Sequence, residues 1–136
     1  MGPSKWTDLD ALDAIGQVVV PIKDLKSQEE TNWYEVQKCG TVVTGHVLLQ
    51  ITRHEEKVVV VLCEGRNLAS ADPNGKSDPY VRLQLGAEKK KSGTVKETLN
   101  PVFHETFEFK TSSKSECQVL DVKVFDWDRV GSDDFL

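Results

Sequence analysis

The sequence lacks any apolar run near the ~20 residues that a membrane-spanning helix requires, so any contact with a membrane has to be peripheral. An apolar stretch is also missing behind the first residues, and we therefore expect no secretory signal. The myristoylation pattern fails as well, because Pro3 follows Gly2 and residue six is Trp6. These absences predict a cytoplasmic protein with peripheral membrane association.

Cysteine is scarce, and Cys39, Cys63 and Cys117 are scattered along the chain and odd in number. Their spacing offers neither a disulfide framework nor the CxxC pairs of a zinc site. We therefore expect free thiols in a reducing compartment.

Positive charge is in the minority, since 17 Lys and Arg against 22 Asp and Glu give a net charge of −5. This balance argues against nucleic acid as a partner. The charges are nevertheless unevenly distributed. Carboxylates gather in a few loops, whereas Lys89, Lys90, Lys91 and Lys96 lie close together. This asymmetry is the first indication of a binding surface.

Helical periodicity is missing, and strand patterns dominate the chain; in residues 45–52, for example, Val47, Leu49 and Ile51 share one face. Eight short strands are predicted, at residues 15–20, 32–37, 45–52, 57–63, 78–85, 91–98, 103–110 and 118–125. Turn-rich segments separate them, which is typical of an all-β, eight-stranded antiparallel Greek-key β-sandwich. The 136 residues are expected to form a single domain.

Two acidic segments, residues 72–80 and 126–134, lie where predicted strands begin or end. Asp126 and Asp128 continue the inward-facing alternation of the last strand, so they should emerge side by side at the rim of the sandwich. Carboxylates packed together repel one another unless a cation neutralises them. Ca²⁺ fits such a cluster, because it takes six to eight hard oxygen ligands from flexible loops.

Other interpretations explain these aspartates less well. Aspartates beside Gly or Pro are ordinary turn formers, but turn formation does not explain an Asp-x-Asp pair that ends a hydrophobic strand. An EF-hand starting at Asp72 would need Gly and Glu where the sequence has Ser77 and Leu83. A metal-dependent transferase is not expected either, because the three histidines are scattered and no nucleophile accompanies the aspartates. We therefore expect no enzyme.

Three stretches carry a resemblance to a known family, namely Asp72-Pro73-Asn74-Gly75-Lys76-Ser77-Asp78-Pro79-Tyr80, Leu99-Asn100-Pro101-Val102-Phe103 and Phe125-Asp126-Trp127-Asp128. With residues 57–63 they make residues 45–136 resemble a C2 domain, a calcium-dependent phospholipid-binding sandwich. The resemblance implies calcium ligands at Asp72, Asp78, Asp126, Asp128 and Asp134, and backbone carbonyl ligands at Ala71 and Trp127. Gly131 stands where some relatives have a Ser ligand, which disfavours a third calcium ion.

The order of the strands departs from the family pattern. Residues 45–136 resemble the first six strands of the family, whereas residues 13–37 resemble its last two and precede them. The chain is therefore either a cyclic permutation or a segment of two consecutive domains. Residues 13–37 are expected to complete the sandwich, within the chain or in a strand-exchanged dimer. Asp13 could then take the place of Asp134 at the calcium site.

The lysine cluster has two interpretations of equal weight. Lysines on an edge strand prevent aggregation, but a basic strand can also bind phosphoinositide head groups. Alternation predicts that Lys96 shares a face with Lys90 in a strand over residues 91–98. Arg129 and Val130, at the tip of the last acidic loop, are predicted to meet the bilayer as a cation and an apolar wedge.

The sequence as a whole predicts a non-enzymatic C2-type module that binds acidic phospholipid membranes when Ca²⁺ is held by its loop aspartates. Phosphatidylserine is the expected lipid, with phosphoinositides as further ligands of the lysines. The alternative is a calcium-independent protein–protein interaction module of the same fold.

Overall fold

The computed structural model describes residues 14–70, 77–111 and 118–127. The elements, in chain order, are β1 (Gly16–Pro21), the 3₁₀ turn η2 (Ile22–Asp24), β2 (Glu29–Lys38), β3 (Val42–Arg53), β4 (Lys57–Arg66), β5 (Pro79–Leu85), β6 (Glu88–Lys91), β7 (Val102–Lys110) and β8 (Val119–Asp126). The described residues contain no helix that is long and apolar enough to cross a membrane. The predicted all-β class is confirmed.

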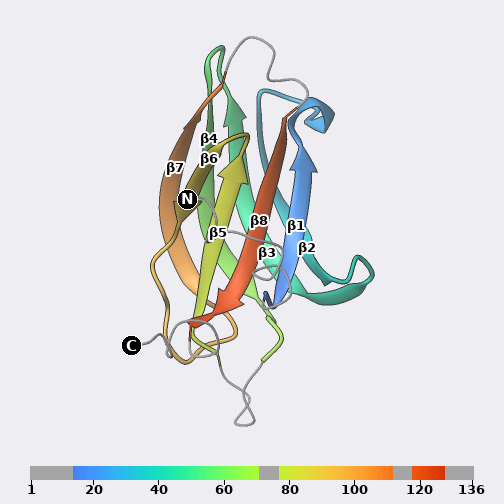
Figure 1. Cartoon of the computed structure of the whole chain (residues 1–136), viewed down its shortest axis with the longest axis vertical. Coiled ribbons are helices and arrows are strands. Elements are labelled where there is room, and N and C mark those ends of the chain that lie inside the picture. The colour runs from blue at the N-terminus through green and yellow to red at the C-terminus, as the bar shows by residue number, and fades with distance from the viewer. Residues whose placement is uncertain (1–13, 71–76, 112–117, 128–136) are drawn as a thin grey trace.

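The eight strands are hydrogen-bonded in the order β6-β5-β8-β1-β2-β3-β4-β7, and every neighbouring pair is antiparallel. Only the Gln17–Gln37 pair joins β1 to β2, whereas β1 pairs with β8 at six positions. The sheet folds over at this weak seam, so that β6-β5-β8-β1 faces β2-β3-β4-β7 (Figure 1). The result is the predicted sandwich, built from one continuous ladder.

The core lies between the two layers. Alternate residues of β4 are buried, namely Val58, Val60 and Leu62, as are Val81, Leu83 and Leu85 of β5. These side chains belong to one apolar cluster, although β4 and β5 are far apart in the strand order. That single cluster is what a period-two pattern produces when two half-buried layers pack face to face.

The predicted strand over residues 91–98 is wrong, because β6 covers Glu88–Lys91 and ends there. Beyond it the chain still follows β5, since the backbone N of Val95 donates to Pro79 O at 3.0 Å. The ladder is interrupted at Ser92, whose Oγ accepts the backbone N–H of Val81 at 2.9 Å. A side chain that takes a backbone donor in this way replaces regular strand pairing.

One end of the sandwich collects the segments that matter for function. β8 ends there at Asp126 directly opposite Pro79, the first residue of β5. β4 ends and β7 begins at the same end, since Leu68 N donates to Leu99 O at 3.0 Å and Thr98 N donates to Ser77 O, next to Asp78, at 2.8 Å. Thr44, near the start of β3, accepts the N–H of Ala69 at 2.9 Å. We call this end the aspartate rim; it is the lower end in Figure 1, where the arrow of β8 ends.

Candidate metal and membrane site

Asp78 and Asp126, which lie 48 positions apart in the sequence, meet at the aspartate rim. The backbone N of Asp78 donates a hydrogen bond to Asp126 Oδ1 at 3.1 Å. Both side chains are buried, with 8% of Asp78 and 1% of Asp126 exposed. The pairing of β5 with β8 therefore places two of the predicted calcium ligands together.

Backbone groups hold this pair in position. The backbone N of Glu97, a residue with φ of +54°, donates to Asp78 Oδ1 at 2.7 Å. The backbone N of Trp127 donates to Asp78 O at 2.8 Å. Carboxylates that gather at one site repel each other, and a divalent cation relieves such repulsion. Their oxygen donors fit a hard cation such as Ca²⁺ better than zinc or copper.

The other predicted ligands, Ala71, Asp72, Asp128, Asp134 and Asp13, lie outside the described residues, as do Arg129 and Val130. Two of the stretches that carry them nevertheless adjoin the pair in the chain. Residues 71–76 lead directly into Ser77 and Asp78, and residues 128–136 follow Trp127. Within ranges 14–70, 77–111 and 118–127, no group of three or more His, Cys, Asp or Glu side chains could hold a metal.

Trp127 packs against Tyr80 and also remains partly exposed to solvent. Its ring meets the edge of Tyr80 with centroids 6.1 Å apart, and Tyr80 stacks on Phe125 at 5.5 Å. Tyr80 and Phe125 form a small buried cluster with Ala14 beneath the rim. Trp127 itself keeps 40% of its surface exposed. The indole therefore braces the end of β8 and still presents apolar surface at the rim.

The structure divides the lysine cluster. Lys90 lies opposite the core residue Leu83, and its Nζ is 5.8 Å from the centroid of the Phe109 ring, so it points toward the inner side of the sheet. Lys91 lies opposite Arg82 and Lys89 opposite Gln84, on the outer side. Lys90 therefore does not share a surface with Lys89 and Lys91.

A basic row that the lysine cluster alone did not reveal crosses the outer face of β6, β5 and β8. Arg82 is opposite Lys91 on one side and Lys123 on the other. The Arg82 guanidinium lies 4.4 Å from the Phe125 ring centroid, and Lys123 Nζ bonds Asp121 Oδ2 at 2.7 Å. The outward parity of Arg82 and Lys123 was readable in the sequence, but their register was not, because it depends on long-range strand pairing.

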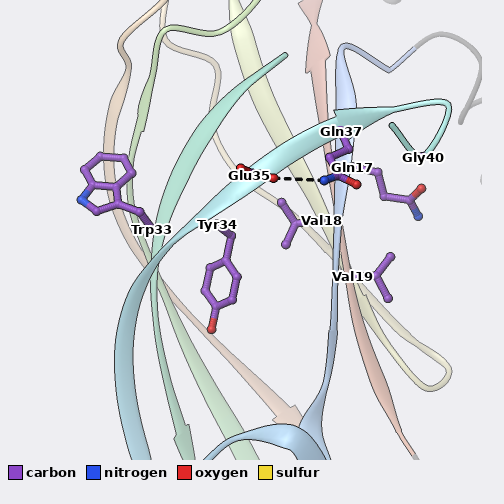
Figure 2. Close-up of a pocket in the computed structure, with 8 residues that line it drawn as sticks. All are labelled: Gln17, Val18, Val19, Trp33, Tyr34, Glu35, Gln37 and Gly40. Carbon is purple, nitrogen blue, oxygen red and sulfur yellow. Dashed lines mark hydrogen bonds between the residues drawn. The ribbon is translucent and has the colours of Figure 1, made fainter. Parts of the chain in front are cut away.

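An open groove of about 400 Å³ follows the seam between β1 and β2. Figure 2 shows the eight residues that line it, Gln17, Val18, Val19, Trp33, Tyr34, Glu35, Gln37 and Gly40. Gln37 Nε2 donates to Glu35 Oε1 at 3.1 Å, the dashed line in Figure 2. Glu35 is the one ionisable carboxyl among these residues, and no His, Cys, Ser or Thr accompanies it. The lining therefore offers no acid–base pair or nucleophile for catalysis.

The described cysteines are free thiols, as the sequence predicts. Cys39 is exposed, whereas Cys63 is partly buried on β4. Burial raises the pKa of the Cys63 thiol, and the neighbouring Glu64 carboxylate raises it further. Thiol reagents, which react with the thiolate, should therefore prefer Cys39 to Cys63.

Known proteins resemble this chain over most of its length. The family model described as C2 domain matches residues 56–136. The chain is 38% identical over 106 residues to the eye isozyme of protein kinase C from Drosophila melanogaster, covering 72% of this chain and 15% of that protein. It is 32% identical over 136 residues to synaptotagmin-7 from Homo sapiens, covering 91% of this chain and 34% of that protein. The chain thus spans 15% and 34% of the lengths of these two relatives.

Solved structures show the same likeness. The third C2 domain of KIAA1228 protein is 34% identical, with a TM-score of 0.53, and the match covers 65% of this chain and 68% of that one. A C2 domain of RIM from Drosophila matches with a TM-score of 0.58 at 21% identity, covering 65% of this chain and 77% of that one. At 21% identity, the second match shows a similar fold and nothing more.

Proposed function

Because the chain belongs to the C2 domain family, we propose that it binds Ca²⁺ at the aspartate rim and thereby attaches to acidic phospholipid membranes, without enzymatic activity. The meeting of Asp78 and Asp126 is the observation that carries this proposal. Two carboxylates that are buried at one end of a sandwich, where loops connect the strands, can bind a hard divalent cation.

The proposed ligand set extends the described pair into the adjoining stretches. Asp78 and Asp126 supply carboxylates from the ends of two paired strands. Asp72, Asp128 and Asp134 would add carboxylates, and Ala71 and Trp127 would add backbone carbonyls. Asp13 is the proposed substitute for Asp134. When bound, Ca²⁺ would change the rim from negative to positive and so attract anionic lipids.

The basic row is the proposed second contact with lipid. Lys91, Arg82 and Lys123 lie in register on one outer face, next to Lys89. Arg82 Nε and Nη1 are buried and Lys123 is paired with Asp121, so Lys91 is the exposed cation of the row. A chain with a net charge of −5 meets an anionic surface through local patches of this kind. Each basic side chain near such a surface contributes ~1 kcal/mol. Phosphoinositide head groups, with their clustered phosphates, are the ligands we propose for this face.

We also propose that residues 13–37 occupy the places of the last two strands of the family. β1 lies beside β8 and β2 lies beside β3, within one chain. Val18, Val20 and Val36 contribute to the same apolar core as β4 and β5. A cyclic permutation and a segment of two consecutive domains both give this arrangement. Pairing within the chain favours a monomer over a strand-exchanged dimer.

Co-sedimentation with phosphatidylserine vesicles, with and without Ca²⁺, tests the proposed function. The double variant D126N/D128N should lose calcium-dependent sedimentation but keep its fold, measured by circular dichroism. D24N is the matched control, because Asp24 lies in η2, which follows the far end of β1. Unchanged sedimentation of the double variant would refute the role of these aspartates.

A calcium-independent protein-interaction module is the second candidate. One observation favours it: an oxygen of each rim carboxylate already accepts a backbone N–H, so the pair also has a structural use. Calorimetric titration distinguishes the two functions. If the unaltered chain releases heat on binding calcium and D126N/D128N does not, calcium-dependent membrane binding is supported. If the unaltered chain shows no heat of calcium binding, the protein-interaction module is supported.

A further inference from the structure

The hairpin that joins β2 to β3, residues 38–43, lies at the aspartate rim. Thr44 follows this hairpin, and its backbone O accepts the N–H of Ala69, which precedes the acidic segment of residues 72–80 by three positions in the sequence. Lys38 Nζ donates to Ala14 O at 3.0 Å, beside the start of β1. In Figure 1 the turn between β2 and β3 projects beside the lower half of the sandwich. The turn between β2 and β3 thus lies at the end of the molecule that carries Asp78 and Asp126.

The tip of this hairpin has a defined conformation. Lys38 and Val42 are opposed across the ladder, and Thr41 N donates to Lys38 O at 3.4 Å. Cys39 and Gly40, two of the three residues between this opposed pair, have φ of +56° and +78°. A β-turn with two successive positive φ angles has a twist that matches that of the strands it joins. The side chains that follow are therefore presented by an ordered element.

The hairpin exposes two large apolar side chains to solvent. All six residues from Lys38 to Val43 are exposed, with Val42 at 58% and Val43 at 46%. Consecutive strand residues point to opposite faces, so neither face of the hairpin is covered here. Six large hydrophobic residues are exposed in the described part of the chain. Four of them, Val42, Val43, Val102 and Trp127, belong to the aspartate rim, and Val19 and Val119 do not.

The charge of the hairpin suits an anionic surface. No Asp or Glu occurs in the sequence between Glu35 and Glu55, although the chain carries 22 of them. Lys38 contributes a cation next to the two valines. An apolar tip beside a cation is the combination that inserts at the boundary between head groups and acyl chains.

We propose that the β2–β3 hairpin is a membrane-contacting element, which inserts Val42 and Val43 into an acidic bilayer when the aspartate rim docks there. This inference rests on the proposed calcium-dependent membrane binding and assigns it a further contact. The lipid bilayer is the partner that covers the exposed valines. Lys38 would remain at the level of the anionic head groups.

Cys39 supplies a reporter at the tip of the hairpin. The variant C63S/C117S keeps Cys39 as its one thiol, and a polarity-sensitive fluorophore can be attached there. With phosphatidylserine vesicles and Ca²⁺, its emission should shift to the blue, and chelation of Ca²⁺ should reverse the shift. Lipids that carry a quencher in the acyl chain should reduce the emission. If the protein sediments with the vesicles but the emission of the fluorophore remains as it is in water, the inference is overturned.

Substitution of the valines gives an independent test. V42S/V43S should lower the vesicle partition coefficient roughly tenfold, since two half-exposed valines add about 1.5 kcal/mol of apolar burial. V19S/V119S is the matched control, because these valines are 55% and 40% exposed but lie away from the rim. The control should bind like the unaltered chain. Calcium binding measured by calorimetry should be unchanged in both variants.

The outcomes distinguish the inference from the function on which it rests. If the unaltered chain fails to sediment with vesicles and Ca²⁺, the proposed function and this inference both fail. If it sediments, but V42S/V43S binds equally well, only the inference about the hairpin is refuted. If sedimentation velocity without vesicles shows self-association that V42S/V43S removes, the hairpin is an interface between copies of the chain and the lipid assignment is overturned.

Discussion

Asp126→Asn removes one charge from the aspartate pair while conserving its shape. The side chain is 1% exposed, and its Oδ1 accepts the backbone N–H of Asp78 at 3.1 Å. The oxygen of an Asn amide can accept the same hydrogen bond. The substitution therefore isolates the effect of charge at the rim, in the absence and in the presence of calcium.

Without calcium, two effects of opposite sign determine the stability of this variant. A hydrogen bond to a charged acceptor contributes about 1.5–3 kcal/mol and a neutral one about 1 kcal/mol, so the substitution loses about 1 kcal/mol. Removing a buried charge gains on the order of 2 kcal/mol in solvation. The free energy of unfolding should therefore rise by about 1 kcal/mol, which is about 4 °C in Tm for a domain of this size.

With calcium, the order of stability should reverse. A ligand at a hundredfold excess over its Kd stabilises the folded state by about 2.7 kcal/mol, or about 10 °C here. The unaltered chain gains this increment and Asp126→Asn does not. Thermal melts followed by circular dichroism, in chelator and in Ca²⁺, measure both orders. A variant that is less stable in chelator would show that the hydrogen bond dominates, and an equal calcium shift in both proteins would refute the metal site.

Two further predictions concern the basic row and the first two strands. K89A/K91A should weaken binding to phosphoinositide vesicles more than to phosphatidylserine vesicles, whereas the inward-facing K90A should have little effect on either; equal losses on both lipids would indicate unspecific charge attraction. Deletion of residues 1–37 removes β1 and β2 and uncovers β3 and β8, so the remainder should aggregate or fail to melt cooperatively. A soluble deletion variant with a cooperative transition would show that the six remaining strands form a sandwich by themselves.

Much of the architecture is local in origin and was readable in the sequence. Alternation of apolar and polar residues fixes which residues of β4, β5 and β8 face the core, because side chains on a strand alternate between faces. The position of Asp126 at the end of an apolar strand is of the same kind. The predicted strand boundaries agree with the structure to within a few residues, except around β6.

The predicted strand over residues 91–98 is wrong because of a contact between residues that are distant in the sequence. Alternation continues past Lys91, but the hydroxyl of Ser92 takes the N–H of Val81 and ends the regular ladder. The same register turns Lys90 toward Phe109 and aligns Lys91 with Arg82 and Lys123. A cluster of lysines in sequence therefore becomes a row that draws on three strands.

What the sequence by itself determined is the strand pattern, the all-β class and the residue types offered to a cation. Only the tertiary structure decided which of those residues meet. Asp78 and Asp126 become neighbours because β5 pairs with β8, and the β2–β3 hairpin joins the same rim because Thr44 bonds Ala69. Strand alternation is a property of consecutive residues, whereas register between distant strands depends on the packing of the whole core.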